Sequence, residues 1–206
     1  MRKICLLLVA LFAGAIPALS TTAIAETAGK TTAKAYFAGG CFWCMESDFE
    51  KREGVVGVVS GFTGGTLANP TYSGNHAGHF EAIEVTYDPA TVSYQDLLTL
   101  FWVNVDPFDN AGQFCDKGFS YRSAIFPAGT EETRLANESL AATAQKFPGE
   151  TIHTEIRPAS AFWPVEEYHQ DYYLKNPIRY KYYRWNCGRD ARLKKLWGDK
   201  ATGGKH

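Results

Sequence analysis

The sequence predicts an α/β or α+β fold in two layers. Segments in which apolar and polar residues alternate are interleaved with segments of helical periodicity along the chain. Glycine, proline and asparagine stand at most boundaries between these segments, and no internal repeat is present. Hydrophobic residues make up 45% of the 206-residue chain, which is sufficient to bury a core.

The first predicted elements are a short strand and a helix. Residues 34–38 form the strand, and the pair Gly39-Gly40 ends it. The helix covers residues 41–52 and is followed by Gly54 as a C-terminal stop. Its buried stripe is formed by three side chains at i, i+3 and i+7, namely Phe42, Met45 and Phe49.

Two strands and a capped helix are predicted next. Residues 55–62 form the first strand, and residues 66–79 form a loop in which His79 has a supporting role. Residues 80–87 alternate and form the second strand. Ser93 is expected to cap a helix over residues 94–104. The apolar face of that helix consists of Leu97, Leu98, Phe101 and Trp102.

In the C-terminal part of the chain, the sequence predicts a loop, two strands and two helices. In chain order these are a loop at 106–119, a strand at 121–126, a helix at 130–146, a strand at 152–158 and a helix at 166–174. Thr130 is expected to cap the first helix, and Asn176-Pro177 stops the second. From Ile178 the sequence is aromatic and basic, then polar, and no element is predicted there.

The first 25 residues have the pattern of a cleaved secretory signal. Arg2 and Lys3 precede an apolar run at residues 4–19, and residues 23–25 (AIA) offer a peptidase site. A membrane anchor is the alternative, but the run is shorter than the ~20 residues that span a bilayer and contains Pro17. We therefore expect an exported protein, periplasmic or extracellular, without membrane attachment after cleavage.

The mature chain is predicted to form one domain. A polar linker at 26–33 precedes a single domain at 34–198, and a polar tail follows at 199–206. Loss of the two basic residues of the signal moves the formal charge from -1 to -3. No basic stripe is present, so a nucleic-acid partner is not predicted, and a monomer is expected.

Four cysteines remain after the signal: Cys41, Cys44, Cys115 and Cys187. Two structural disulfides are the default in an exported protein, although a chain with 14% aromatic residues folds without them. Cys41 follows a glycine pair at a predicted helix start, where partial positive charge should lower its pKa. Cys44 shares its helix face at a Cβ separation of ~5–6 Å, so a disulfide between them would be strained and easily reduced.

Three interpretations of this Cys-x-x-Cys motif compete. A structural zinc site needs a second close pair of ligands, and Cys115 and Cys187 are isolated in the sequence. A thioredoxin-like oxidoreductase would carry a later cis-proline loop, for which no clear candidate is present. The favoured interpretation is a nucleophile that acts on a small substrate. The aromatic side chains of Phe42 and Trp43 suit a methyl group, although Phe42 can equally pack in the core.

Glu81 is the candidate acid. It shares a strand face with Ile83, Val85 and Tyr87, so its carboxyl should be desolvated. Desolvation raises the pKa of a carboxyl and lets it donate a proton near neutral pH. The alternative is a carboxylate at the strand end that reaches solvent or pairs with a lysine.

Six short motifs occur in a fixed order along the chain. They are 40–43 (GCFW), 61–65 (GFTGG), 69–72 (NPTY), 78–82 (GHFEA), 85–89 (VTYDP) and 121–125 (YRSAI). This set resembles the A-type peptide methionine-S-sulfoxide reductases over residues 35–176. The resemblance implies a two-layer sandwich with a mixed central sheet flanked by helices and a ferredoxin-like core.

The resemblance also implies the chemistry. The Cys41 thiolate attacks the sulfoxide sulfur, and Glu81 protonates the oxygen with help from Tyr72 and Tyr121. Asp116 organises the site. The substrate is methionine-S-sulfoxide, free or in oxidised proteins, and neither a cofactor nor a metal is expected.

The implied cycle ends with thiol chemistry. Phe42 and Trp43 hold the S-methyl group while Cys41 becomes a sulfenic acid, which a resolving cysteine attacks. Cys44 is favoured for the first disulfide and Cys187 for relay to thioredoxin or a thioredoxin-like exported donor. Cys115 is a third candidate, and a purely structural Cys115–Cys187 bond is the alternative.

Some residues depart from the family pattern or allow another function. Ser120 and Cys115 replace the common Gln and Asn, and the loop at 73–78 is short. The aromatic cluster of the tail would suit a binding module, but tail packing is the favoured interpretation. That cluster is Tyr180, Tyr182, Tyr183 and Trp185.

Overall fold

The computed structural model describes residues 31–201. The expected signal at 1–25 and the parts of the linker and tail at 26–30 and 202–206 lie outside the described residues. The ordered elements run from Ala33 to Lys200, close to the expected domain limits of 34 and 198. Within the described residues, no helix is long and apolar enough to cross a membrane.

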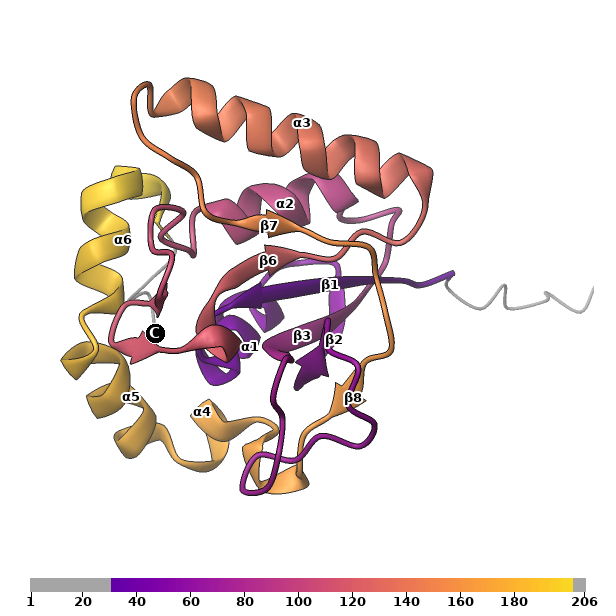
Figure 1. Ribbon diagram of the computed structural model, residues 1–206, viewed down its shortest axis with the longest axis vertical. Helices are drawn as coiled ribbons and strands as arrows, with labels where there is room; N and C mark the ends of the chain where they lie inside the picture. The colour runs from indigo at the N-terminus through magenta and orange to yellow at the C-terminus, as the bar shows by residue number, and fades with distance from the viewer. Residues whose placement is uncertain (1–30, 202–206) are drawn as a thin grey trace, which may run out of the picture.

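A six-stranded mixed sheet forms the centre of the domain (Figure 1). Its strand order is β7-β6-β1-β3-β2-β8. The strands are β1 (Ala33–Gly39), β2 (Val55–Thr63), β3 (Phe80–Tyr87), β6 (Ser123–Ile125), β7 (Glu155–Ile156) and β8 (Trp163–Pro164). All pairs are antiparallel except β6 with β7. A separate hairpin joins β4 (Gly112–Gln113) to β5 (Asp116–Lys117).

The four inner strands form a split βαβ arrangement. The chain runs β1–α1–β2–β3–α2–β6, with α1 at Phe42–Glu50 and α2 at Tyr94–Trp102. In the order β6-β1-β3-β2, β3 lies between β1 and β2 and the last strand, β6, lies on the outer side of β1, which is the ferredoxin-like pattern. The predicted two-layer fold with a mixed sheet is therefore confirmed.

Both inner helices cover the same face of the sheet. The predicted stripe of α1 and the predicted apolar face of α2 are buried there against the inner strands. Phe37 of β1 contacts Phe49 and Phe101 at ring-centroid distances of 5.3 and 5.5 Å, so strand and helices share one core. Ser93 caps α2 as predicted and forms a capping box with Asp96.

Several elements differ from the prediction. Helix α3 (Thr130–Lys146), which packs on α2 (Figure 1), is preceded by Gly129 in the cap position, so Thr130 is its first residue. The predicted strand at 152–158 contains only the two residues of β7. The strand expected at 121–126 begins at Ser123, because a 3-10 turn (Phe119–Tyr121) precedes it.

The segment at 166–174 is not one helix. A 3-10 turn (Glu167–His169) ends before Asp171, whose φ of 53° interrupts the helical path. The short helix α4 (Tyr172–Lys175) follows. This break turns the chain toward the N-terminal end of α1.

The tail after Pro177 forms two helices that the sequence analysis did not predict. They are α5 (Pro177–Asn186) and α6 (Arg189–Trp197), and they run along one side of the domain (Figure 1). The side chains they bury include Arg184 and Arg189, both at most 2% exposed. Because arginine is normally exposed, a hydrophobic pattern does not detect such helices. Of the aromatic cluster, Tyr180 is buried as expected, but Trp185 is 74% exposed.

Candidate active site

Cys41 occupies the N-cap position of α1 and is 6% exposed. Gly40 allows this placement because its φ is +84° and a Cβ there would lie 2.6 Å from Cβ of Gln113. Gln113 is itself fixed, since it exchanges two hydrogen bonds with the backbone of Asp106. The predicted position at the start of a helix is therefore confirmed.

Glu81 lies next to the N-terminal end of α1. It belongs to the core-facing side of β3, and it is 2% exposed. The backbone N–H of Phe42 donates to its Oε2 at 3.2 Å, and the Tyr121 hydroxyl also bonds the carboxyl. Burial nevertheless raises the pKa of Glu81 to about 8. The desolvated acid inferred from the strand pattern is thus present, and the solvent-exposed alternative is wrong.

The two thiols of α1 share a hydrogen bond. Burial first, then the contact with Cys44, raises the pKa of Cys41 well above its ordinary value. The same hydrogen bond, together with the guanidinium groups of Arg189 and Arg184, lowers the pKa of Cys44 to about 7. The expected lowering of the Cys41 pKa by the helix start is therefore wrong for this state, because burial outweighs it. Near neutral pH Cys44 is therefore the thiol of the pair that loses its proton more easily.

A cavity of about 60 Å³ joins the candidate residues. It is lined by Cys41, Phe42, Trp43, Tyr72, Glu81, Asp116, Tyr121 and Tyr183. All seven residues predicted to react with, bind or organise the substrate are thus brought together, and Tyr183 is added. The cavity is small enough to favour the head of a side chain over a larger molecule.

Trp43 forms one wall of the cavity and is held from two sides. Its ring stacks on Tyr172 of α4 at 3.7 Å, and its Nε1–H donates to Nδ1 of His169 at 3.1 Å. Phe42 lines the cavity and also packs in the main core, so both interpretations of that residue apply. The broken segment before α4 therefore positions the aromatic wall.

Two tyrosines reach the cavity from separate loops. The backbone N–H of Tyr72 is held by the Glu166 carboxylate at 3.3 Å, and its ring lies 4.2 Å from His169. Burial raises the pKa of Tyr72 to about 12 and also raises that of Tyr121. Both hydroxyls are therefore protonated at neutral pH and can donate hydrogen bonds. His79, expected to support this loop, accepts from Gly65 N–H at 3.3 Å and contacts the Leu67 carbonyl at 2.9 Å.

Tyr183 is the site residue that the sequence analysis missed. Its hydroxyl donates to Oδ2 of Asp116 at 2.5 Å and contributes a hydrogen bond that lowers the pKa of Cys41. It lies on α5, one helical turn before Cys187. The four-residue spacing between Tyr183 and Cys187 could have indicated that both lie on one helix face, but only if the tail had been predicted to be helical.

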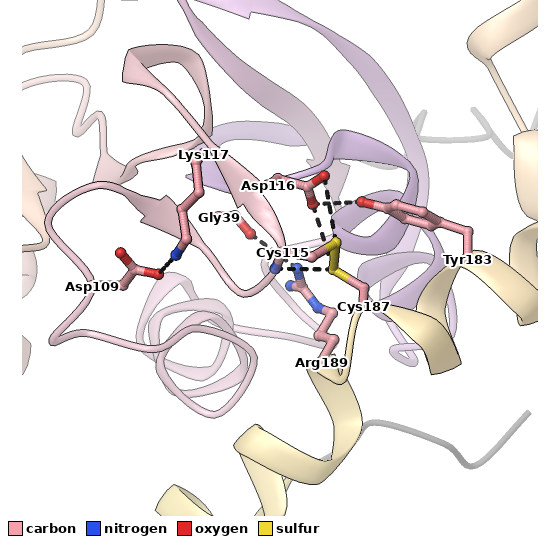
Figure 2. The surroundings of a disulfide bond; sticks show 8 residues. All are labelled: Gly39, Asp109, Cys115, Asp116, Lys117, Tyr183, Cys187 and Arg189. Carbon is pink, nitrogen blue, oxygen red and sulfur yellow. Dashed lines mark hydrogen bonds and ion pairs between the residues drawn. A yellow bond between two sulfur atoms is a disulfide. The ribbon is translucent and has the colours of Figure 1, made fainter.

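The other two cysteines form a disulfide at the edge of the cavity (Figure 2). Cys115 precedes Asp116 in the β4–β5 hairpin, and Cys187 ends α5. Cys41 and Cys44 are free. The bond ties the hairpin that carries Asp116 to the helix that carries Tyr183.

Buried charges attach the tail to the centre of the site. Arg189 of α6 donates to the carbonyl oxygens of Gly39 and Asn104 at 3.1 and 2.7 Å. Arg184 of α5 pairs with Asp48 of α1 at 3.0 Å, and both are nearly inaccessible to solvent. Helices α5 and α6 therefore fix the backbone that precedes Cys41 through these two arginines.

Comparison with known proteins gives a consistent result. The family profile described as peptide methionine sulfoxide reductase matches residues 33–201. Peptide methionine sulfoxide reductase MsrA 2 of Caulobacter vibrioides is 49% identical, over 93% of this chain and 98% of that relative.

Solved structures share the fold. Methionine sulfoxide reductase A of Corynebacterium diphtheriae has a TM-score of 0.67 and 34% identity, covering 73% of this chain and 78% of that one. Mxr1 of Saccharomyces cerevisiae in reduced form has a TM-score of 0.66 and 27% identity, covering 71% and 87%. Mxr1 has also been solved in complex with Trx2; that chain has 20% identity and a TM-score of 0.50, and it covers 71% and 91%.

The position of Glu81 predicts a falling limb in the pH profile of the reaction. With a pKa of about 8, the proton on Glu81 is lost as the pH rises through 8, so kcat/KM should fall about tenfold per unit above it. The fall cannot come from a thiol, because thiolate becomes more abundant as pH rises. Glu81→Gln should abolish the limb and lower the rate by roughly 10²- to 10⁴-fold.

Glu84→Gln is the matched control for this experiment. Glu84 lies on the other face of the same strand and pairs with Lys34. It should keep both the rate and the limb. A wild-type profile that stays level to pH 10, or a fully active Glu81→Gln enzyme, would contradict the assignment.

Proposed function

This chain belongs to the peptide methionine sulfoxide reductase family, and we propose that it reduces the sulfoxide by attack of Cys41 on sulfur while Glu81 protonates oxygen. The chain is an oxidoreductase whose substrate is methionine sulfoxide. The observation that supports the proposed roles is the 3.2 Å hydrogen bond between Phe42 N–H and Glu81, which holds a neutral acid next to the nucleophile.

The chemical step balances with these two groups. Cys41 transfers its proton to Cys44, and its thiolate then bonds to the sulfoxide sulfur. Glu81 donates a proton to the oxygen, because an unprotonated sulfoxide oxygen leaves poorly. The oxygen ends on Cys41 as a sulfenic acid, and methionine departs two electrons more reduced. Glu81 is left as a carboxylate and is reprotonated from solvent.

The walls of the cavity account for binding and for the choice of epimer. Phe42 and Trp43 provide an apolar surface for the S-methyl group, and Tyr72 and Tyr121 donate to the oxygen from the side of Glu81. These contacts set methyl and oxygen on different walls, with sulfur facing Cys41. A chiral sulfoxide satisfies all of them in one configuration, for which we infer the S epimer.

We propose that Cys44 resolves the sulfenic acid. Cys44 is one turn from Cys41 and is hydrogen-bonded to its thiol, and its lowered pKa of about 7 supplies a thiolate. Attack on the sulfenic sulfur forms Cys41–Cys44 and breaks the S–O bond, and the leaving hydroxide takes up the proton that Cys44 gives up and departs as water. Reduced Cys115 and Cys187 then exchange with that disulfide. The exchange frees Cys41 and Cys44 and forms a Cys115–Cys187 disulfide at the surface, where Cys115 is exposed.

A dithiol protein of the thioredoxin type fits as the final reductant. A Cys115–Cys187 bond beside two free thiols is the arrangement that the relay leaves before the donor acts. The solved complex of Mxr1 with Trx2 supports this partner class. The alternative is a structural Cys115–Cys187 bond that turnover does not touch.

The nucleophile assignment is tested by stereospecific turnover. Purified mature protein with dithiothreitol should consume methionine-S-sulfoxide and leave the R epimer intact, as measured by chiral chromatography. Cys41→Ser should reduce the rate to background, because no other thiol lines the cavity. Ser47→Ala on the same helix is the control. Activity that persists in Cys41→Ser would contradict the mechanism.

The resolving cysteine is tested by mapping disulfides after one turnover. Fully reduced protein given one equivalent of substrate should form Cys41–Cys44 first and Cys115–Cys187 later in quenched-flow peptide mass spectra. Cys44→Ser should accumulate sulfenic acid, which dimedone traps. A first bond between Cys41 and Cys187 would replace Cys44 in this role, and an unchanged Cys115–Cys187 throughout would make that bond structural.

We also infer that the chain is exported and acts there as a monomer without membrane attachment, with an exported thioredoxin-like donor. The signal pattern of residues 1–25 supports this location. In a Gram-negative host the full chain should be recovered from the periplasm with Glu26 as its first residue, and a chain lacking residues 2–25 should stay in the cytoplasm. Recovery of uncleaved protein in the membrane fraction would contradict export.

A further inference from the structure

The fold brings together three potential metal ligands that the sequence keeps apart. Cys115 and Asp116 lie on the β4–β5 hairpin, and Cys187 is 72 residues from Cys115. Oδ1 of Asp116 is 3.8 Å from Sγ of Cys115, and Oδ2 is 3.8 Å from Sγ of Cys187. All three donor atoms lie within 4.8 Å of one another (Figure 2). Cys115 and Cys187 are therefore isolated in the sequence but adjacent in the fold.

These distances suit a tetrahedral zinc ion. Zn–S bonds of ~2.3 Å and Zn–O bonds of ~2.0–2.2 Å place sulfur and oxygen ligands about 3.5 Å apart and two sulfurs about 3.8 Å apart. Each sulfur already lies 3.8 Å from one oxygen of Asp116, which is Oδ1 for Cys115 and Oδ2 for Cys187. A single carboxylate oxygen lies within 4.8 Å of both sulfurs, so binding of zinc through that oxygen needs a closure of up to roughly 1 Å. Once the disulfide is reduced, the two sulfurs move apart to the contact distance of unbonded sulfurs, which is close to the ~3.8 Å between two zinc-bound thiolates.

We propose that reduction of Cys115–Cys187 creates a zinc site from the two thiolates and the Asp116 carboxylate, with water in the fourth position. A dithiol donor supplies two electrons and two protons, so that the Cys115–Cys187 bond breaks and the donor becomes the disulfide. Zinc then displaces the thiol protons. The oxidised protein offers no thiolate and forms no such site.

The surroundings favour metal-bound thiolates at this place. The backbone N–H of Cys115 points at Sγ of Cys187 at 3.1 Å, a contact that stabilises negative sulfur. The guanidinium group of Arg189 and the ammonium group of Lys117 act on Asp116 and offset part of the charge of three anionic ligands. Cys115 is exposed, so an ion can enter, and thiolate ligands favour Zn²⁺ over Mg²⁺ and Ca²⁺.

Zinc in this site would act on the sulfoxide pocket. The metal would compete with the Tyr183 hydroxyl for Oδ2 of Asp116, and both residues line the cavity. It would also hold Cys187 away from thiol exchange. Reduced enzyme with bound zinc should therefore be inhibited until the metal leaves.

Cobalt(II) titration tests the site independently of activity. The full mature chain carrying Cys41→Ser and Cys44→Ser, which removes the competing dithiol, is reduced with a phosphine. It should bind one equivalent of Co²⁺ with the visible bands of tetrahedral thiolate coordination, and Zn²⁺ should displace the colour. The oxidised form of the same protein should show no bands.

Three further substitutions identify the ligands. Cys115→Ser or Cys187→Ser, each on its own, should abolish the bands, and two positions on different elements guard against a folding defect. Asp116→Asn should weaken binding by at least tenfold, since loss of an outer-shell partner alone costs roughly 10–100-fold. Asp109→Asn removes the carboxylate that pairs with Lys117 and leaves the positive charge of Lys117 to the site, so this control variant should not bind the metal more weakly.

Equal binding by oxidised protein, or binding that survives Cys187→Ser and Cys115→Ser, would overturn the proposal. So would an Asp116→Asn affinity equal to that of Asp109→Asn. The result is separable from the proposed function, because the wild-type enzyme is assayed for sulfoxide reduction without metal. Failure of that assay leaves the titration unchanged.

Discussion

The hydrogen bond from the Phe42 N–H to Glu81 joins the first turn of α1 to the core face of β3. It sets the acid and the nucleophile side by side, and it occurs where burial strongly disfavours charge. A pKa of about 8 against an ordinary 4.5 means that ionising Glu81 in place costs about 5 kcal/mol more than in water. The folded state keeps a proton that the unfolded chain loses, so this carboxyl contributes full stability below pH 4.5, which is lost as the pH rises to about 8.

The rest of the structure shields Cys41 and Glu81 from water and holds them in place. The tail helices α5 and α6 supply Tyr183, which lines the cavity. They also supply Arg189, which donates to the carbonyl of Gly39, and Arg184, which pairs with Asp48. The hydrogen bond with Cys41 and, after it, the buried arginines lower the pKa of Cys44, whereas burial raises that of Cys41. One helix therefore holds two thiols with different tasks: a protected nucleophile and an available thiolate. Arg184 and Arg189 of the tail add to that difference, which the thiol–thiol hydrogen bond and burial set in the first place.

Periodicity predicted the parts of the fold in which apolar residues face the core. The stripe of α1, the capped helix α2 and the face of β3 that carries Glu81 all follow from spacing. Helices α5 and α6 could not be predicted in this way, because the side chains they bury include Arg184 and Arg189, whose partners come from distant elements. For the same reason the sequence did not indicate Tyr183, and it left the Cys115–Cys187 bond as an alternative only. The lowered pKa expected for Cys41 was wrong because a helix start predicts partial charge but not depth of burial.

The central claim is that Glu81 is a neutral acid beside Cys41 at working pH. Difference infrared spectroscopy of wild type minus Glu81→Gln at pH 6.5 tests it directly, since a neutral carboxyl has a C=O stretch that a carboxylate lacks. We predict a single carboxylic-acid band that shifts in D₂O and disappears with a midpoint near pH 8. A carboxylate band at pH 6.5 in place of the acid band would contradict the account.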